Sequence, residues 1–125
     1  MKFDNRTMPE SVAGEAAVLG SMLIDTESIP KVIEIIGDNP QAFYHLENRL
    51  IYEAIIHLYE KFAYPNKNVS RPVEFKVTIQ KLVAELESKN RLELVGGVNY
   101  IAQLTRAAKP KNQLLKLIEI IKGEK

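Results

Sequence analysis

Apolar residues recur every three to four positions along most of this chain, which is the spacing of one face of an α-helix. Residues 12–23 show this period and should follow an N-cap at Ser11 and end at Asp25. The longest periodic segment covers residues 47–62, and its predicted buried face consists of Leu50, Ile51, Ala54, Ile55, Leu58, Tyr59 and Phe62. The pattern therefore predicts a helix near the N-terminus and a long helix in the middle of the chain.

A short apolar segment, Ile29 to Ile36, allows two interpretations. Pro30 favours the start of a helix, because proline fits the first turn, and Gly37 favours its end. The same run could form a strand, but no second strand-like run lies nearby to pair with it. We expect a helix here, then a turn, and then three residues that contribute to the core: Phe43, Tyr44 and Leu46.

Prolines, glycines and asparagines divide the second half of the chain, and each cluster predicts a boundary. The stretch from Ala63 to Pro72 is the longest irregular segment and is expected to be an exposed loop. A fourth helix should follow it and close at Asn90, since asparagine tolerates the left-handed conformation. Its predicted apolar face consists of Phe75, Ile79, Leu82, Val83 and Leu86.

Gly96 and Gly97 predict a break before a short fifth helix. The apolar face of that helix consists of Val98, Ile101 and Leu104. Pro110 separates it from the last helix. Six helices with no convincing strand predict an all-α fold, a small orthogonal bundle with short connections.

The last helix is expected to carry more apolar residues than one buried stripe needs. Six of the eight residues from 114 to 121 are large and apolar: Leu114, Leu115, Leu117, Ile118, Ile120 and Ile121. Four of these already form a stripe, and Leu115 and Ile120 widen it. At roughly 1.5–3 kcal/mol per buried large side chain, leaving this surplus pair in water would forgo several kcal/mol.

Two surfaces could cover the surplus pair. The domain itself could fold over Leu115 and Ile120, or a partner chain could pack on them. We favour the partner chain, because the sequence stops at Lys125 and no following segment could fold back over this helix. All six apolar residues of the last helix are therefore predicted interface residues.

Composition limits the class of protein. The chain has 125 residues, of which 46% are hydrophobic and 26% are charged, so one domain with a packed core is expected. It has no cysteine, which excludes disulfides and thiolate metal ligands and fits a reducing compartment. No apolar run reaches the roughly 18 residues of a membrane span, and no signal sequence opens the chain. We therefore expect a cytoplasmic protein without a membrane segment.

The net charge of +1 hides an asymmetry. Residues 1–62 carry 5 basic and 10 acidic side chains, whereas residues 63–125 carry 12 basic and 6 acidic ones. The basic half could contact a nucleic-acid backbone through Lys67, Arg71, Lys76, Lys81, Arg106, Lys109, Lys111, Lys116, Lys122 and Lys125. Aromatic residues that could stack on bases are nearly absent there, because Phe75 and Tyr100 lie on apolar periods. A charge bias of this size is more often a solvated face.

Residues that could carry chemistry are scattered. The two histidines, His45 and His57, have no further imidazole or thiolate at a ligand spacing, so no metal site is predicted. Glu53 lies one turn before His57, but such a pair on a helix face is usually surface support. Gly14 and Gly20 are not followed by the lysine of a phosphate-binding loop and are interpreted as helix-packing contacts. No catalytic, cofactor-binding or metal-binding residue is predicted.

Several short motifs, taken in order, resemble one known family. The chain opens with a P-x-S…E-x-x-V-L-G pattern over residues 9–20. It continues with Phe43-Tyr44 and an R-L-I-Y block within residues 48–55, and then has a G-G-x-x-Y element over residues 96–100. Their order and spacing resemble the N-terminal domain of DnaB-type replicative DNA helicases, from about Pro9 to the end of the chain.

This resemblance implies a small helical bundle that precedes a RecA-like ATPase motor in the same polypeptide and forms a collar on a hexameric ring. It implies sister helicase subunits, primase and a helicase loader as partners, with DNA bound mainly by the motor. ATP and Mg²⁺ would bind only to that motor, which is absent from this chain. The chain itself would then have no cofactor and no catalytic site, although the full-length protein would be an ATP-dependent DNA helicase.

The resemblance also implies a division of the chain. Residues 1–8 would be a flexible tail, residues 9–109 the helical bundle, and residues 110–125 the start of a helical hairpin or linker. The last helix resembles the first arm of the hairpin through which neighbouring domains pair, which would explain its wide apolar surface. Two other functions stay open: a stand-alone nucleic-acid-binding helical domain, and the helicase-binding domain of a primase. The opening motif favours the helicase.

Overall fold

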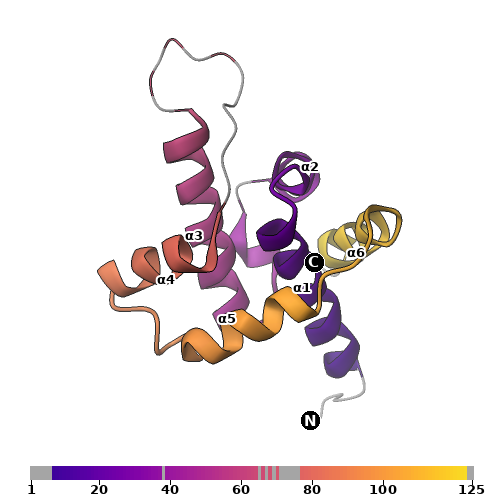
Figure 1. Ribbon diagram of the computed structural model, residues 1–125. Helices are drawn as coiled ribbons and strands as arrows, with labels where there is room; N and C mark the ends of the chain where they lie inside the picture. Colours follow the sequence, from indigo (N-terminus) through magenta and orange to yellow (C-terminus); the bar gives the residue numbers. More distant parts are fainter. Residues whose placement is uncertain are drawn as a thin grey trace.

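The computed structural model describes residues 7–37, 39–64, 66, 68, 70 and 77–123, with side chains from residue 14 onward except those of 111, 122 and 123. Its elements in chain order are α1 (Thr7–Ile24), α2 (Ser28–Ile36), the 3₁₀ helix η1 (Pro40–Ala42), α3 (Leu46–Ala63), α4 (Ile79–Ser88), α5 (Gly97–Arg106) and α6 (Lys111–Gly123). Figure 1 shows their arrangement. No strand occurs within the ranges just given, so the predicted all-α fold is confirmed.

The helices cross one another instead of running parallel. α3 passes through the middle of the bundle, and α4 and α5 run across it (Figure 1). α1 packs against α5 and α6, and α6 also packs against α2. α6 therefore lies on the side of the bundle away from α4 (Figure 1). This is the orthogonal bundle that the sequence predicts.

Most helices begin and end close to the predicted positions, but α4 begins only at Ile79 and α1 begins earlier than predicted. α2 covers the predicted helical segment and ends at Gly37, whose φ is 81°, so the strand interpretation is excluded. α1 starts at Thr7 and not after an N-cap at Ser11, so that prediction is wrong. Proline in a first helical turn lacks only an N–H that would have no helical partner, and Pro9 therefore permits the earlier start. Two residues of the predicted tail thus belong to α1, and residues 1–6 lie outside the described residues.

Three left-handed residues shape the connection between α4 and α5. Asn90 has a φ of 58°, as the sequence predicts, and Gly96 and Gly97 have φ values of 101° and 76°. Residues with a Cβ are disfavoured at such angles, which explains glycine at the last two positions. The Arg91 N–H donates to the carbonyl oxygen of Leu86 over 2.8 Å and closes the end of α4.

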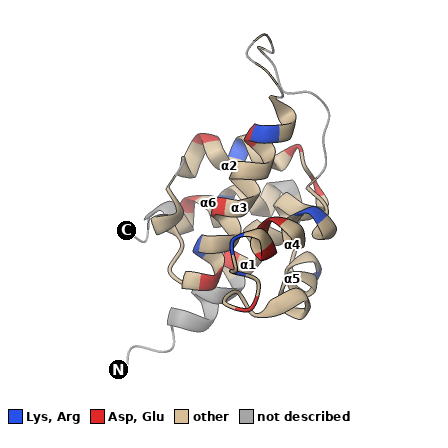
Figure 2. Ribbon diagram, turned by 90° about the vertical axis from the view of Figure 1, so that its left-hand side faces the viewer, with Lys and Arg blue, Asp and Glu red and all other residues tan. Residues whose placement is uncertain are grey.

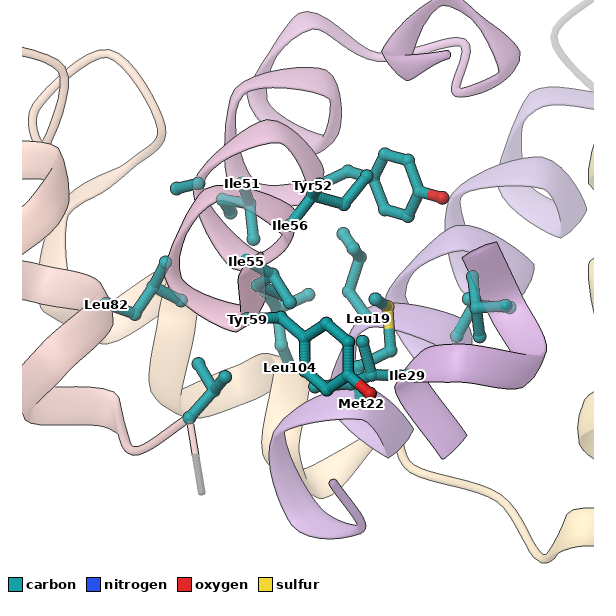
Figure 3. Packing of buried hydrophobic residues seen from close by; sticks show 14 of the residues in the cluster. Leu19, Met22, Ile29, Ile51, Tyr52, Ile55, Ile56, Tyr59, Leu82 and Leu104 are labelled. Atoms are coloured by element: carbon teal, nitrogen blue, oxygen red, sulfur yellow. The ribbon is translucent and has the colours of Figure 1, made fainter. Parts of the chain in front are cut away.

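One cluster of buried apolar side chains joins all the helices (Figure 3). α3 contributes more of it than any other helix, and five residues of its predicted face are buried: Ile51, Ala54, Ile55, Leu58 and Tyr59. Tyr52, which the period does not select, is also fully buried, and its ring centroid lies 4.8 Å from that of Phe43. The Tyr52 hydroxyl donates to the carbonyl oxygen of Gly37 over 2.7 Å, which makes the burial of a phenol affordable.

The turn that leads into α3 differs from the predicted burial of its apolar residues. Phe43 is fully buried, but Tyr44 and Leu46 are exposed, so their prediction as core residues is wrong. The chain turns from η1 into α3 at this point, and only the first of the three side chains points inward. A run of apolar residues in a turn has no period, and the sequence therefore gives no means of choosing among them.

Two further apolar residues lie outside the core. Phe62, in the last turn of α3, is 40% exposed, whereas Ala63 next to it is buried. Val98 is exposed in the first turn of α5, ahead of the point where that helix reaches the core at Ile101. Phe75 and much of the predicted loop from Ala63 to Pro72 lie outside the described residues.

Candidate interaction site

α6 places its six apolar residues in different environments. Leu114, Ile118 and Ile121 are buried in the core of this same chain, and Leu117 is partly buried against it. This corrects the expectation that all six residues face a partner, because α1 and α2 cover the inner side of α6. The two surplus residues behave differently, since Leu115 is 43% exposed and Ile120 is 55% exposed.

The two exposed residues border the buried stripe of α6. At 3.6 residues per turn, positions 115 and 120 are separated by roughly 140° around the helix axis. Leu115 and Ile120 therefore lie on opposite edges of the stripe, with the exposed residues Lys116 and Glu119 between them. We refer to Leu115 and Ile120 as the α6 flanks.

Two glycines of α1 lie where other helices pack against it. A Cβ added to Gly20 of α1 would lie only 1.8 Å from the carbonyl oxygen of Leu104 in α5. A Cβ added to Gly14 would lie 3.7 Å from Leu117 Cδ2, at ordinary contact distance. The two glycines are therefore helix-packing contacts, as the sequence predicts, and Gly20 is required by the close approach of α1 and α5.

A buried carboxylate connects α1, α3 and α5. Glu15 of α1 is fully buried and accepts hydrogen bonds from the Tyr44 N–H (2.5 Å), the Asn48 side-chain amide (2.7 Å) and, more distantly, the His45 N–H (3.4 Å). Asn48 in turn accepts a 2.6 Å hydrogen bond from the Tyr100 hydroxyl of α5. We call Glu15, Asn48 and Tyr100 the Glu15 network. Two donors on the turn into α3 and one on its first turn thus satisfy a charge that would otherwise be costly to bury.

A pocket lies beside this network, between the first turns of α3 and α5. Its volume is about 450 Å³, and we call it the α3–α5 pocket; it is lined by His45, Glu47, Val95, Gly96, Asn99, Tyr100 and Gln103. Burial raises the pKa of the Tyr100 phenol above its usual value, and the carboxylates of Glu47 and Glu15 raise it further, against the opposing hydrogen bond with Asn48. Two carboxylates therefore act on the phenol that lines this pocket.

His57 and Glu53, which lie one turn apart on α3, each contact a different partner. His57 Nδ1 lies 2.7 Å from a carboxylate oxygen of Glu85 in α4, and Lys89 Nζ lies 3.3 Å from the same oxygen. Glu53 pairs with Arg91 over 2.9 Å instead. Burial would raise the pKa of Glu85, but the hydrogen bonds with Lys89 and His57 outweigh it, so this pKa lies below its usual value. These contacts hold α4 against α3 and form no catalytic pair.

Neither a cluster of metal-ligating residues nor a membrane-spanning helix occurs in the described part of the chain. No group of three or more histidines, aspartates and glutamates there could hold a metal ion. No helix in the same residues is both long and apolar enough to cross a membrane.

Comparison with known families identifies the domain. The model of the DnaB-like helicase N terminal domain matches residues 7–123. This chain belongs to that family. The resemblance of its motifs to this family is therefore confirmed, and the six-helix bundle is the family fold.

Relatives and a solved structure agree with the assignment. The chain is 35% identical over 100 residues to the replicative DNA helicase DnaB of Rhodothermus marinus, covering 80% of this chain and 9% of that protein. It is 30% identical over 105 residues to the DnaB of Geobacillus stearothermophilus, covering 84% and 20%. The crystal structure of the N-terminal domain of DnaB helicase from Mycobacterium tuberculosis superimposes with a TM-score of 0.73 at 25% identity, covering 90% of this chain and 72% of that one. This DnaB-like domain thus spans at most a fifth of the two helicases.

The Glu15 network explains why the family motifs of this DnaB-like domain occur together. Glu15 belongs to the opening motif, Tyr44 to the F-Y pair, Asn48 to the start of the next block, and Tyr100 to the G-G-x-x-Y element. Hydrogen bonds link these residues across three helices. The order of the motifs alone does not reveal this connection, because they lie far apart in the sequence. One feature of the sequence indicates a special role for Glu15, because it is the only charged residue between Val12 and Ile24.

The described basic residues of this DnaB-like domain are spread over several elements, and the ribbon in Figure 2 shows Lys and Arg mixed with Asp and Glu along the chain. Lys81, Arg106, Lys109 and Lys116 are exposed on three different parts of the fold. The remaining predicted phosphate contacts lie outside the described side chains: Lys67, Arg71, Lys76, Lys111, Lys122 and Lys125. The described part of the chain therefore offers no continuous track for a nucleic-acid backbone.

Proposed function

We propose that this chain is the N-terminal collar domain of a replicative DNA helicase and acts as a protein-protein interaction module. Its partners are sister subunits of the helicase, with primase and a helicase loader as further partners. ATP, Mg²⁺ and most DNA contacts belong to a motor that would lie elsewhere in the full-length protein. Membership of the family supports this proposal, as do relatives named replicative DNA helicases of which the chain matches only 9–20%.

The observation that carries the proposal is the exposure of the α6 flanks. α6 is held in place by three buried side chains, so presenting Leu115 and Ile120 to a partner needs little further ordering of the helix. Each large side chain that becomes fully buried contributes roughly 1.5–3 kcal/mol. Because the flanks lie on opposite edges of the stripe, two neighbouring helices are needed to cover both. Helices from a sister subunit, packed along α6 as in a small bundle, meet this requirement.

The test uses the 125-residue chain and two charge substitutions, Leu115→Glu and Ile120→Glu. Sedimentation velocity over a range of concentrations should show self-association of the unchanged chain. Each substitution should weaken the association constant at least tenfold, the equivalent of about 1.4 kcal/mol, because a carboxylate would be buried at the interface. Circular dichroism and thermal unfolding should show that both variants keep the fold, because both positions are exposed.

Gln113→Glu is the matched control, since it adds the same charge at an exposed position of the same helix. It should associate as the unchanged chain does. A chain that stays monomeric at every concentration would contradict the role of α6 in subunit pairing. So would flank variants that unfold the monomer without changing association, because Leu115 and Ile120 would then be ordinary core residues.

Titration with single-stranded DNA separates the collar domain from the nucleic-acid binder. We expect no saturation below about 100 μM protein at moderate salt, since the described cations are dispersed. A nucleic-acid binder would bind more tightly and would show a steep loss of affinity between low and moderate salt.

A further inference from the structure

The α3–α5 pocket is separate from the α6 flanks and has its own chemistry. It lies where α5 passes the first turn of α3, with Glu47 on one side and Asn99 and Gln103 on the other. None of the described residues that line it is a lysine or an arginine. Glu15 lies in the buried network at the N-terminal end of α3, where the helix dipole favours a carboxylate. Among the described lining residues, Glu47 therefore supplies the carboxylate.

One of the residues that line the pocket holds a buried polar atom without a hydrogen-bond partner. His45 Nε2 is buried and makes no hydrogen bond within the described chain, whereas the backbone N–H of His45 donates to Glu15. In the tautomer protonated at Nδ1, this nitrogen is an acceptor. The amide oxygens of Asn99 and Gln103 are further acceptors that line the pocket. A ligand with several N–H donors and a positive charge would suit this set, and an anion would be repelled by Glu47.

Exposed apolar residues adjoin the lining of the pocket in sequence. Leu46 is 57% exposed, Leu94 is 61% exposed and Val98 is 48% exposed. Each is next in sequence to a residue that lines the pocket, so apolar side chains are available close to it. Exposed apolar residues grouped around a polar depression are typical of protein-binding surfaces.

We propose that the α3–α5 pocket binds a lysine or arginine side chain of a partner protein, presented by a segment with apolar residues on both sides of it. The cationic group meets the Glu47 carboxylate and the free acceptors, and the flanking apolar residues pack on Leu46, Leu94 and Val98. The wall of the pocket is already held by the hydrogen bond between Tyr100 and Asn48, so binding requires no rearrangement of the two helices.

The experiment uses the ¹⁵N-labelled 125-residue chain and the tripeptide Leu-Arg-Leu, acetylated and amidated at its ends. The matched control peptide carries citrulline in place of arginine, which keeps the shape and removes the charge. We expect saturable shifts of the amide resonances of Gly96, Gly97 and Asn99 at millimolar peptide, and affinity for the citrulline peptide that is at least fivefold weaker. Equal affinity for both peptides, or no saturable shift at these amides, would overturn the proposal.

Two protein variants locate the charge. Glu47→Gln should weaken binding of the arginine peptide about fivefold without changing the spectrum elsewhere, because Glu47 is exposed and outside the core. Glu119→Gln removes the same charge from an exposed position on α6 and should leave binding unchanged. Equal losses in both variants would show only attraction to overall negative charge and would overturn the proposal. Since the readout is binding to the single chain, its failure leaves association through α6 unaffected.

Discussion

Two glutamates connect helices of this bundle in different surroundings. Glu15 is fully buried and accepts hydrogen bonds from N–H groups of the segment that begins α3. Glu85 of α4 also contacts α3, but its partners His57 and Lys89 are each nearly half exposed to solvent. Water can replace the partners of Glu85, whereas nothing can replace those of Glu15. The comparison shows that burial, more than the number of contacts, decides how much a polar group contributes to the fold.

The largest effect is expected at the buried glutamate. Glu15→Ala would leave two close donors, the Tyr44 N–H and the Asn48 amide, without an acceptor, and would create a small cavity. The free energy of unfolding should fall by about 4 kcal/mol, as measured by urea denaturation.

Glu15→Gln is the control, because it keeps the volume and one acceptor oxygen. It should cost about half as much as Glu15→Ala. A loss below about 1 kcal/mol for the alanine variant would show that water enters and satisfies the donors, and the contrast with Glu85 would then disappear.

A smaller effect is expected where α1 meets α5. Gly20→Ala would place a Cβ 1.8 Å from the Leu104 carbonyl oxygen, so the two helices would have to separate. We expect a loss of about 3 kcal/mol in the free energy of unfolding, measured by thermal or urea denaturation.

Gly14→Ala is the matched control on the same helix. Its new Cβ would be 3.7 Å from Leu117, at contact distance, and alanine is the better helix former by about 1 kcal/mol. This variant should therefore be slightly more stable than the unchanged chain. Similar losses for both alanine variants would mean that the close approach at Gly20 is not what matters.

The smallest effect is expected at the ion pairs of Glu85, whose partners His57 and Lys89 are each nearly half exposed. Glu85→Gln should cost no more than about 1 kcal/mol at neutral pH, because ion pairs with solvent-exposed partners contribute little. The pKa of Glu85 is lowered in the folded state, so its contribution is complete above the ordinary value of 4.5 and is lost as the pH falls through the lowered value.

The measurement is the difference in unfolding free energy between Glu85→Gln and the unchanged chain as a function of pH. The difference should be constant above the ordinary pKa of Glu85 and should approach zero in acid. A difference that grows as the pH falls would have the wrong sign for a lowered pKa.

Periodic segments were predictable from the sequence because they are determined locally. The face of α3, the end of α2 at Gly37 and the left-handed Asn90 each follow from a few neighbouring residues. The first turn of α1 was missed because Ser11 is a good N-cap but Pro9 also fits a helical first turn. Tyr44 and Leu46 were misplaced because a turn has no period to show which side chain faces inward.

The candidate site was only partly predictable for a related reason. The count of apolar residues on the last helix indicates that Leu115 and Ile120 exceed one stripe, and both are exposed. It cannot show that Leu114, Ile118 and Ile121 are covered by α1 and α2, because those helices are distant in sequence. The α3–α5 pocket has no signal at all in the sequence, since its walls come from two helices about fifty residues apart.

The sequence by itself determined the helices, their breaks and the family, because hydrophobic period, backbone preference and motif order are properties of neighbouring residues. The tertiary structure alone decided that Glu15 meets Asn48, that Gly20 lies against Leu104, and that the two edges of α6 stay in water. These depend on which helices approach each other and how closely. Such distances are set by packing across the whole bundle, which no local pattern encodes.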